Sequence, residues 1–301
     1  MKKILFRKYH NTTMVKSKRL EGVVIALPTP LLENENIDAP SLRKLLDYCI
    51  QEGANGIMIL GTMGEGAALL DSQRRLVVEH TVTHIAGRVP VLATVSDVST
   101  RKTLEFVKAI DRSGVDYIVC TSPFYYKFPD PKSILRHINT IADTVAVPLI
   151  FYNAPGMTGN NVDVDTTEKI LNMEKIAGIK DSSCNYGNFV ELLRRYPDKN
   201  DRPGTIMQGD ESVFDASLLM GADGVVSGGG VAFIKALVAL YNAGVSNDKG
   251  KSIACQRKFT KDMNALLGPN LSRDWVFNIK KRLVDMNIIA HASVTSPFLT
   301  N

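Results

Sequence analysis

The sequence lacks any cysteine pair at the spacing of a metal site or a redox couple. Its four cysteines are scattered over 301 residues, and no Cys-x-x-Cys motif occurs. A chain of this length buries a core large enough to need no disulfides. We therefore expect reduced thiols, a cytoplasmic location and no metal centre.

Long apolar runs and aromatic clusters are also missing. No uninterrupted apolar stretch approaches the roughly 18 residues of a membrane span. Only 7% of the residues are aromatic, with a single tryptophan, and Gly (22) and Pro (13) stay near ordinary usage. This composition excludes low-complexity and collagen-like chains. Trp275 and its basic neighbours form no aromatic and basic platform, so neither a membrane nor a nucleic acid is an expected partner.

Acidic residues are absent from the first 20 positions, which hold seven of the 36 Lys and Arg residues. The remaining 29 bases face 31 acids, so the formal charge of +5 belongs to this segment and the body is slightly acidic. We interpret residues 1–20 as a basic, disordered N-terminal extension. Without an apolar stretch of about 7 to 15 residues, it does not resemble a secretory signal.

Short apolar runs rich in Val and Ile recur along the body, each followed by a polar or glycine-containing turn and a helix-like segment. They predict eight strands, at Val23–Leu27, Gly56–Leu60, Val89–Val95, Tyr117–Thr121, Pro148–Tyr152, Ile176–Lys180, Thr205–Gly209 and Gly224–Ser227. The runs are continuously apolar, whereas half-exposed antiparallel strands alternate. They therefore indicate a parallel sheet covered by helices on its faces.

Helix signals separate these runs. Ser41, Asp71 and Ser99 precede amphipathic segments that close near glycines. Eight β/α units favour an α/β fold, a (β/α)8 TIM barrel with a helical C-terminal appendix. We place the barrel at residues 21–230. Residues 231–301 hold the last barrel helix and the packed appendix, in three helical stretches at Phe233–Ala243, Ile253–Leu267 and Arg273–Asn287.

Catalytic side chains of such barrels lie at the carboxyl ends of the strands. Lys180 ends one buried run, and a desolvated lysine amine is what Schiff-base chemistry with a carbonyl needs. An alternative is a lysine that reaches the rim or pairs with Asp181. Tyr152 ends the preceding run and could move protons, or simply bond a backbone carbonyl. Thr62 lies in a glycine-rich turn that could hold an anion or be an ordinary β/α loop.

Together these features resemble the dihydrodipicolinate synthase/N-acetylneuraminate lyase family of class I aldolases, over about residues 20–290. Gly61–Glu65 is similar to the family's GTTGE or GSTGE motif, and Ser122–Tyr126 to its Pro-Phe/Tyr-Tyr motif. Tyr152–Pro155 is similar to YNxP, and Gly178–Asp181 to GIKE or ALKQ. The four motifs occur in the family's order at compatible spacings.

The resemblance implies a role for each matched residue. Lys180 falls on the lysine that forms a Schiff base with pyruvate, and Tyr152 on the catalytic tyrosine. Thr62 falls on the hydroxyl that links this tyrosine to a second one, which Tyr125 matches and which a neighbouring subunit supplies. The resemblance thus implies a homotetramer, a dimer of dimers, with no cofactor beyond the covalent pyruvate adduct. Its substrate-binding positions fall on Met63, Ser182, Gly209, Asp210, Glu211, Val226 and Gly228.

Departures from the family pattern bear on the substrate. Dihydrodipicolinate synthases carry an arginine after YNxP for the aldehyde's carboxylate, whereas this chain has Met157. Gln208–Glu211 resembles the GxDE stretch of sialic acid lyases, although its acids could equally cap a helix that begins near Ser212. Met63 replaces a threonine that helps bind the pyruvate carboxylate. Gly228 stands where sialic acid lyases have a serine.

The sequence predicts a pyruvate-dependent class I aldolase or lyase. The favoured substrate is a 2-oxo-3-deoxy sugar acid, of the N-acetylneuraminate or keto-deoxygluconate type, cleaved to pyruvate and an aldehyde. The alternative within the family is 4-hydroxy-tetrahydrodipicolinate synthase, which condenses pyruvate with aspartate semialdehyde. An alternative of a different class is a catalytically silent barrel tethered to an anionic partner by its basic tail. The intact set of Lys180, Tyr152 and Thr62 disfavours that reading.

Overall fold

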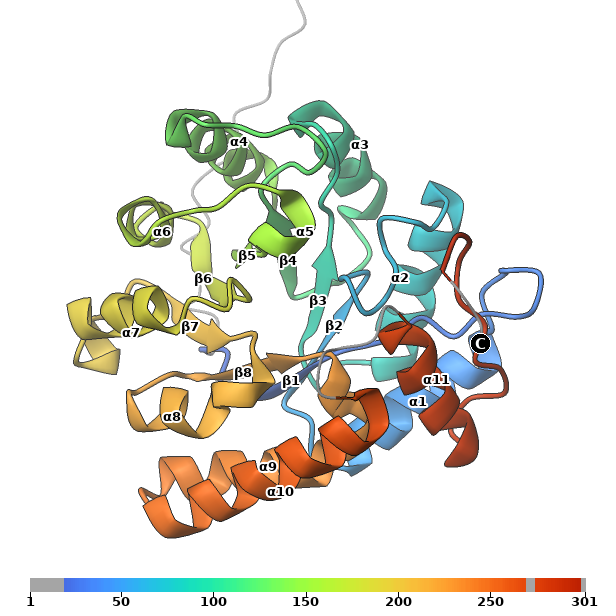
Figure 1. Cartoon of the computed structure of the whole chain (residues 1–301). Helices are drawn as coiled ribbons and strands as arrows, with labels where there is room; N and C mark the ends of the chain where they lie inside the picture. Colours follow the sequence, from blue (N-terminus) through green and yellow to red (C-terminus); the bar gives the residue numbers. More distant parts are fainter. Residues whose placement is uncertain (1–18, 269–273, 299–301) are drawn as a thin grey trace, which may run out of the picture.

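Eight parallel strands close into a barrel in the computed structural model, which describes residues 19–268 and 274–298 (Figure 1). Each strand pairs with the next along the chain, and β1 pairs with β8. The strands are β1 (Gly22–Ala26), β2 (Gly56–Ile59), β3 (Val91–Thr94), β4 (Tyr117–Thr121), β5 (Leu149–Asn153), β6 (Ile176–Asp181), β7 (Thr205–Gln208) and β8 (Gly224–Ser227). The predicted (β/α)8 barrel is confirmed.

Helices surround the strands and give the runs their continuous burial. The barrel's helices are α1 (Ala39–Gln51), α2 (Asp71–Ile85), α3 (Thr100–Ile110), α4 (Pro131–Thr144), α5 (Pro155–Thr158), α6 (Val164–Leu171), α7 (Tyr186–Arg195), α8 (Phe214–Leu219) and α9 (Ile234–Val245). Both faces of each strand are covered, and of the 37 strand residues only Ala177 is more than marginally exposed. This burial explains why the strands read as unbroken apolar segments.

The helix caps differ in detail from the sequence prediction. Ser99 caps α3, as expected, by accepting a hydrogen bond from the backbone of Lys102. Ser41 does not cap α1, because the side chain of Asp38 takes that place. The Ser41 hydroxyl instead accepts a hydrogen bond from the Ala290 backbone at 2.9 Å and so ties α1 to the C-terminal segment.

The C-terminal appendix packs on one side of the barrel. It consists of α10 (Lys249–Leu267), which lies along α9, and α11 (Trp275–Asp285), which lies near α1 (Figure 1). The chain then returns along the side of the barrel that holds α1 and α2. Among the described residues, no helix combines the length and apolarity that a membrane crossing requires.

The N-terminal boundary shifts by two residues. Arg19 and Leu20 were assigned to the extension, yet Leu20 is buried and the Arg19 guanidinium lies 3.0 Å from the buried carboxylate of Asp223. Both residues therefore belong to the closed end of the barrel. Residues 1–18, which carry the remaining six basic side chains of the predicted extension, lie outside the described residues.

Candidate active site

Lys180 and Tyr152 lie side by side at the carboxyl end of the barrel. In the parallel ladder of β5 and β6, Tyr152 pairs with Lys180, and Asn153 pairs with Asp181. Successive side chains of a strand point to opposite faces, so the first pair faces the barrel interior and the second faces the surrounding helices. The register alone therefore brings the predicted lysine and tyrosine together.

Asp181 is not the ion-pair partner of Lys180 that the alternative reading assumed. Its carboxylate accepts hydrogen bonds from the Asn153 amide at 2.8 Å and from the Ser183 hydroxyl at 2.6 Å. These contacts hold the Asp181 side chain at the end of β6 on the face turned away from the cavity. The Lys180 side chain instead lines the cavity at the centre of the barrel mouth.

The Lys180 amine is buried beside an aromatic ring and a thioether. The residue is 5% exposed, and Nζ lies 3.9 Å from the centroid of the Tyr152 ring and 3.9 Å from Sδ of Met58. No described carboxylate forms an ion pair with this amine. An amine in such surroundings is suited to attack a carbonyl carbon.

Tyr152 is poised to ionise more readily than an ordinary tyrosine. Burial by itself raises the pKa of the phenol. The charge of Lys180 and the hydrogen bonds with Thr62, Ser182 and Lys180 outweigh burial, so the pKa of Tyr152 lies below its usual value. A phenol with this balance of contacts can accept and return a proton at a neighbouring carbon or oxygen.

Thr62 reaches Tyr152 from the tight loop that follows β2. Leu60 and Glu65 adopt left-handed backbone angles, with φ of 60° and 55°. Gly66 packs so closely that a Cβ atom there would lie 2.0 Å from the Leu60 carbonyl oxygen. The glycines of this motif therefore allow the loop to fold back on the strand end and present the Thr62 hydroxyl.

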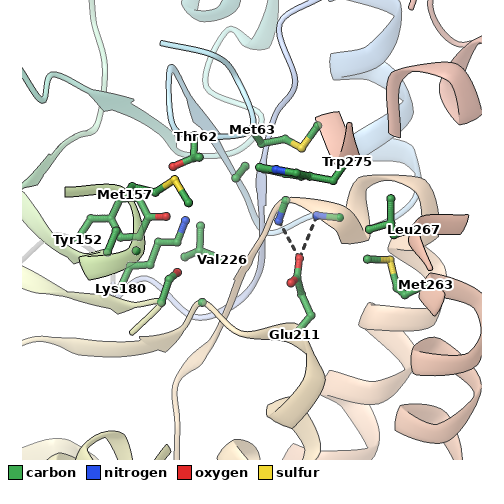
Figure 2. A pocket seen from close by; sticks show the side chains of 17 residues that line it. Thr62, Met63, Tyr152, Met157, Lys180, Glu211, Val226, Met263, Leu267 and Trp275 are labelled. Carbon is green, nitrogen blue, oxygen red and sulfur yellow. Dashed lines mark hydrogen bonds between the residues drawn. The ribbon is translucent and has the colours of Figure 1, made fainter. Parts of the chain in front are cut away.

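Glu211 enters the cavity from the opposite side, whereas Asp210 does not. One Glu211 oxygen accepts hydrogen bonds from the Ser227 hydroxyl (2.7 Å) and from the backbone of Gly228 (3.0 Å) and Gly229 (2.9 Å), as Figure 2 shows in part. The Asp210 side chain instead bonds the backbone and hydroxyl of Ser212 and caps a 3-10 helix, Glu211–Val213. One oxygen of Asp210 is thus used in helix capping, and Asp210 does not line the cavity that Glu211 enters.

Two departures from the family pattern lie in contact with each other. A Cβ atom at Gly228 would sit 3.3 Å from Cβ of Met63 and 3.6 Å from its Cγ. Met63 is 2% exposed and fills the space beside the glycine. Met63 and Gly228 thus form one local part of the cavity wall, which offers a methionine side chain and no side-chain hydroxyl.

These residues surround a cavity of about 230 Å³ (Figure 2). Nine predicted residues line it: Thr62, Met63, Tyr152, Lys180, Ser182, Gly209, Glu211, Val226 and Gly228. Tyr125 is not among them. The residue is 82% exposed, its ring stacks edge-on against Tyr126 at 5.0 Å, and its φ of 78° lies in the left-handed region.

The C-terminal appendix supplies part of the cavity wall, which sequence reasoning missed. Met263, Leu267 and Trp275 line the cavity from α10 and the start of α11, and Figure 2 shows them opposite Tyr152. Trp275 was considered only as a possible nucleic-acid contact. The sole tryptophan of the chain was the one signal available. The described residues hold no cluster of three or more His, Cys, Asp or Glu side chains arranged for a metal ion.

A second cavity of about 310 Å³ lies on the other side of Tyr152. Thr62, Tyr152 and Met157 line both cavities. The remaining wall is mostly apolar, with hydroxyls from Thr94, Ser96 and Thr121 and the ring of Phe298. The tyrosine and threonine are thus accessible from two directions.

Comparison with known proteins identifies the family of this chain. The model of the dihydrodipicolinate synthetase family matches residues 19–301. This chain belongs to that family. It is 32% identical to 4-hydroxy-tetrahydrodipicolinate synthase from Neisseria gonorrhoeae over 229 residues, which cover 76% of this chain and 77% of the relative. It is 31% identical to the same enzyme from Methanothermobacter thermautotrophicus over 69% of this chain and 74% of the relative.

Solved structures are similar to this chain over nearly its whole length. Chloride-inhibited dihydrodipicolinate synthase from Acinetobacter baumannii, complexed with pyruvate, superimposes with a TM-score of 0.85 at 27% identity and 93% coverage of each chain. CdNal from Clostridium difficile, in complex with mannosamine, gives a TM-score of 0.86 at 21% identity and 94% coverage of each chain, which indicates a shared fold. As a member of this family, the protein is a class I lyase. The family's chemistry is a lysine Schiff base with pyruvate, without a cofactor.

Proposed function

We propose that Lys180 forms the Schiff base with pyruvate and that Tyr152 moves the protons of the reaction. The observation that carries this proposal is the placement of the Lys180 amine 3.9 Å from the Tyr152 ring, inside a cavity of about 230 Å³. The pKa of Tyr152, which the charge of Lys180 holds below its usual value, supports a role in proton transfer.

In the cleavage direction, the Lys180 amine attacks the C2 ketone of a 2-oxo acid, and loss of water leaves a protonated imine. Tyr152 takes the proton of the C4 hydroxyl as the C3–C4 bond breaks. The bonding electrons move to the iminium nitrogen, so an aldehyde leaves and an enamine remains. Protonation at C3 and addition of water then release pyruvate and restore the amine. Thr62 holds the Tyr152 phenol throughout.

Reduction with borohydride in the presence of pyruvate tests the covalent step. We expect a pyruvyl adduct on the peptide that contains Lys180, found by peptide mass mapping, and none in the Lys180→Met variant. Lys175 lies just before the same strand and serves as a control, because its amine bonds the Val145 carbonyl outside the cavity. An adduct elsewhere, or no adduct at all, contradicts the proposal.

The aldehyde partner has two candidates. The first is a polyhydroxylated aldehyde released from a 2-oxo-3-deoxy sugar acid. Glu211 supports it, since one oxygen is held by three donors and the other is left to accept hydrogen bonds from hydroxyls. Met157 also supports it, because a methionine offers no donor to a carboxylate.

The second candidate is aspartate semialdehyde, which would make the protein a 4-hydroxy-tetrahydrodipicolinate synthase. The names of the curated relatives support this candidate, and more strongly than they support a sugar acid. A panel of N-acetylneuraminate, keto-deoxygluconate, and pyruvate with aspartate semialdehyde separates the two. Turnover of aspartate semialdehyde alone would show that Met157 does not exclude a carboxylate.

We further propose a homotetramer in which Tyr125 enters the neighbouring subunit's cavity behind Thr62 and Tyr152. The exposed ring of Tyr125 and the 310 Å³ cavity beside Tyr152 support this exchange. Mixing Tyr125→Phe subunits with Lys180→Met subunits tests it. If the tyrosine acts across the interface, hybrids regain activity, because each pair rebuilds one complete site. Activity that stays at the level of the separate variants contradicts the exchange.

A further inference from the structure

The loop that carries Thr62 is bound to a segment more than 200 positions away. One carboxylate oxygen of Glu65 accepts hydrogen bonds from the Thr295 backbone at 2.6 Å and from the Thr295 hydroxyl at 2.9 Å. The other lies 2.5 Å from the Lys280 amine. The C-terminal segment is therefore bound to the loop through the Glu65 carboxylate.

These groups are fully removed from water. Glu65 is 3%, Lys280 0% and Thr295 3% exposed. The Lys280 amine also donates to the Ser293 carbonyl at 2.6 Å, so it links α11 to the segment that follows this helix. Burial of an ion pair costs desolvation energy that its attraction does not reliably recover, so stability alone is a weak reason for such a pair.

Glu65 in turn restrains Thr62 through the backbone. The Glu65 N–H donates to the Thr62 carbonyl at 3.2 Å, and the Gly66 N–H donates to the Gly61 carbonyl at 3.3 Å. The left-handed φ of Glu65 and the close approach of Gly66 to Leu60 leave the loop little freedom. A displacement of the Glu65 carboxylate should therefore also move Thr62, which lies three residues earlier in the same restrained loop.

We propose that Glu65, Lys280 and Thr295 are positioning residues that set the place of the Thr62 hydroxyl against Tyr152. The C-terminal segment thereby controls the proton relay without touching substrate. This inference rests on the proposed function of Thr62 and Tyr152, but not on the identity of the aldehyde.

The test compares two neighbouring hydroxyls of the C-terminal segment. Thr295→Val removes one donor to Glu65 and keeps the side-chain shape and the backbone N–H. Ser296→Ala removes a hydroxyl that donates to the half-buried Glu35 at 2.6 Å instead of to Glu65. We expect Thr295→Val to lower kcat roughly 10-fold, since a misplacement of about 1 Å can cost up to about 100-fold. KM for pyruvate and borohydride trapping on Lys180 stay unchanged. Ser296→Ala and the conservative Thr295→Ser keep wild-type kinetics.

A spectroscopic readout separates positioning from loss of fold. Because Thr62 helps to lower the pKa of Tyr152, its displacement raises that pKa in Thr295→Val, as an ultraviolet titration of tyrosinate records. Equal kinetics and equal titrations for Thr295→Val and Ser296→Ala overturn the inference. So does a loss of kcat that only follows the unfolded fraction. If the wild type traps no pyruvate, the proposed function fails, whereas the titration still reports on the position of Thr62.

Discussion

Lys180 and Lys280 are two buried lysines of one chain with opposite surroundings. Lys180 ends β6, is 5% exposed and faces a cavity with the Tyr152 ring beside it. Lys280 lies on α11, is 0% exposed and contacts the Glu65 carboxylate at 2.5 Å. The first amine has space for a small molecule and the second has none.

The difference separates a chemical role from a structural one. A buried amine without a carboxylate partner is available to react, although its burial is unfavourable. An amine paired with a carboxylate and a carbonyl is fixed in place, and loss of either partner leaves a charge stranded in the core. Lys180 should thus matter for turnover and little for stability, whereas Lys280 should matter most for stability and affect turnover only through Glu65 and Thr62.

Loss of Lys180 is the change with the largest expected effect. In Lys180→Met, we expect turnover to fall by about 10⁴-fold or more, the scale on which loss of a covalent nucleophile acts. Borohydride trapping should vanish with it. The free energy of unfolding, measured in urea, should stay the same or rise, because a buried amine without a carboxylate partner is removed. A large loss of stability would break the comparison.

Tyr152→Phe comes next. We expect kcat to drop by about 10² to 10⁴-fold, the usual contribution of a positioned proton carrier. Some pyruvyl adduct on Lys180 should still form, which separates the roles of the two side chains. Tyr48→Phe is a matched control, since Tyr48 is partly buried on α1 away from the cavity. Wild-type turnover in Tyr152→Phe would remove the tyrosine from the reaction.

Lys280→Met probes the paired lysine. Leaving Glu65 buried without its partner should lower the free energy of unfolding by about 3 to 5 kcal/mol in urea denaturation. The double variant Glu65→Gln/Lys280→Met should recover part of this loss, because no charge remains unpaired. If the double variant is the less stable of the two, the charge pair is not the cause.

The smallest expected effect is a shift in the pKa of Tyr152 when Lys180 is replaced. The charge of Lys180 is the largest contribution that lowers the pKa of Tyr152, and burial opposes it. In Lys180→Met the burial remains and the charge is gone, so the pKa of Tyr152 should rise and its tyrosinate signal should move to higher pH. Lys280→Met removes no charge beside Tyr152 and acts only through Thr62, so it should move that signal less than Lys180→Met does. Tyr48, whose pKa burial raises to about 12, gives a reference titration in the same spectra.

Much of the barrel could be predicted from local sequence. The runs Tyr117–Thr121 and Gly224–Ser227 match β4 and β8 residue for residue, and the others differ by one or two positions at one or both ends. Helix caps were less predictable. Ser41 and Asp38 are both suited to cap α1, and only the contact between Ser41 and Ala290 shows which of them is engaged elsewhere.

The site residues likewise divide into those that the sequence predicted and those that it did not. Lys180 and Tyr152 were predictable because each ends an apolar run, and strand ends converge at the mouth of a barrel. The sequence could not show which of Asp210 and Glu211 enters the cavity, because the two acids are adjacent and similar. Only the backbone conformation decides which of them caps a helix. Met263, Leu267 and Trp275 carry no motif at all.

The sequence by itself determined the strands, the order of the β/α units and the two reactive side chains at the strand ends, because these depend on neighbours within a few residues. The tertiary structure decided the rest. The wall built by α10 and α11, the match of Met63 with Gly228, and the contact of Glu65 with Thr295 across 230 positions all join distant segments. Such contacts depend on how the closed barrel brings its loops and its C-terminal appendix together, and no local pattern encodes them.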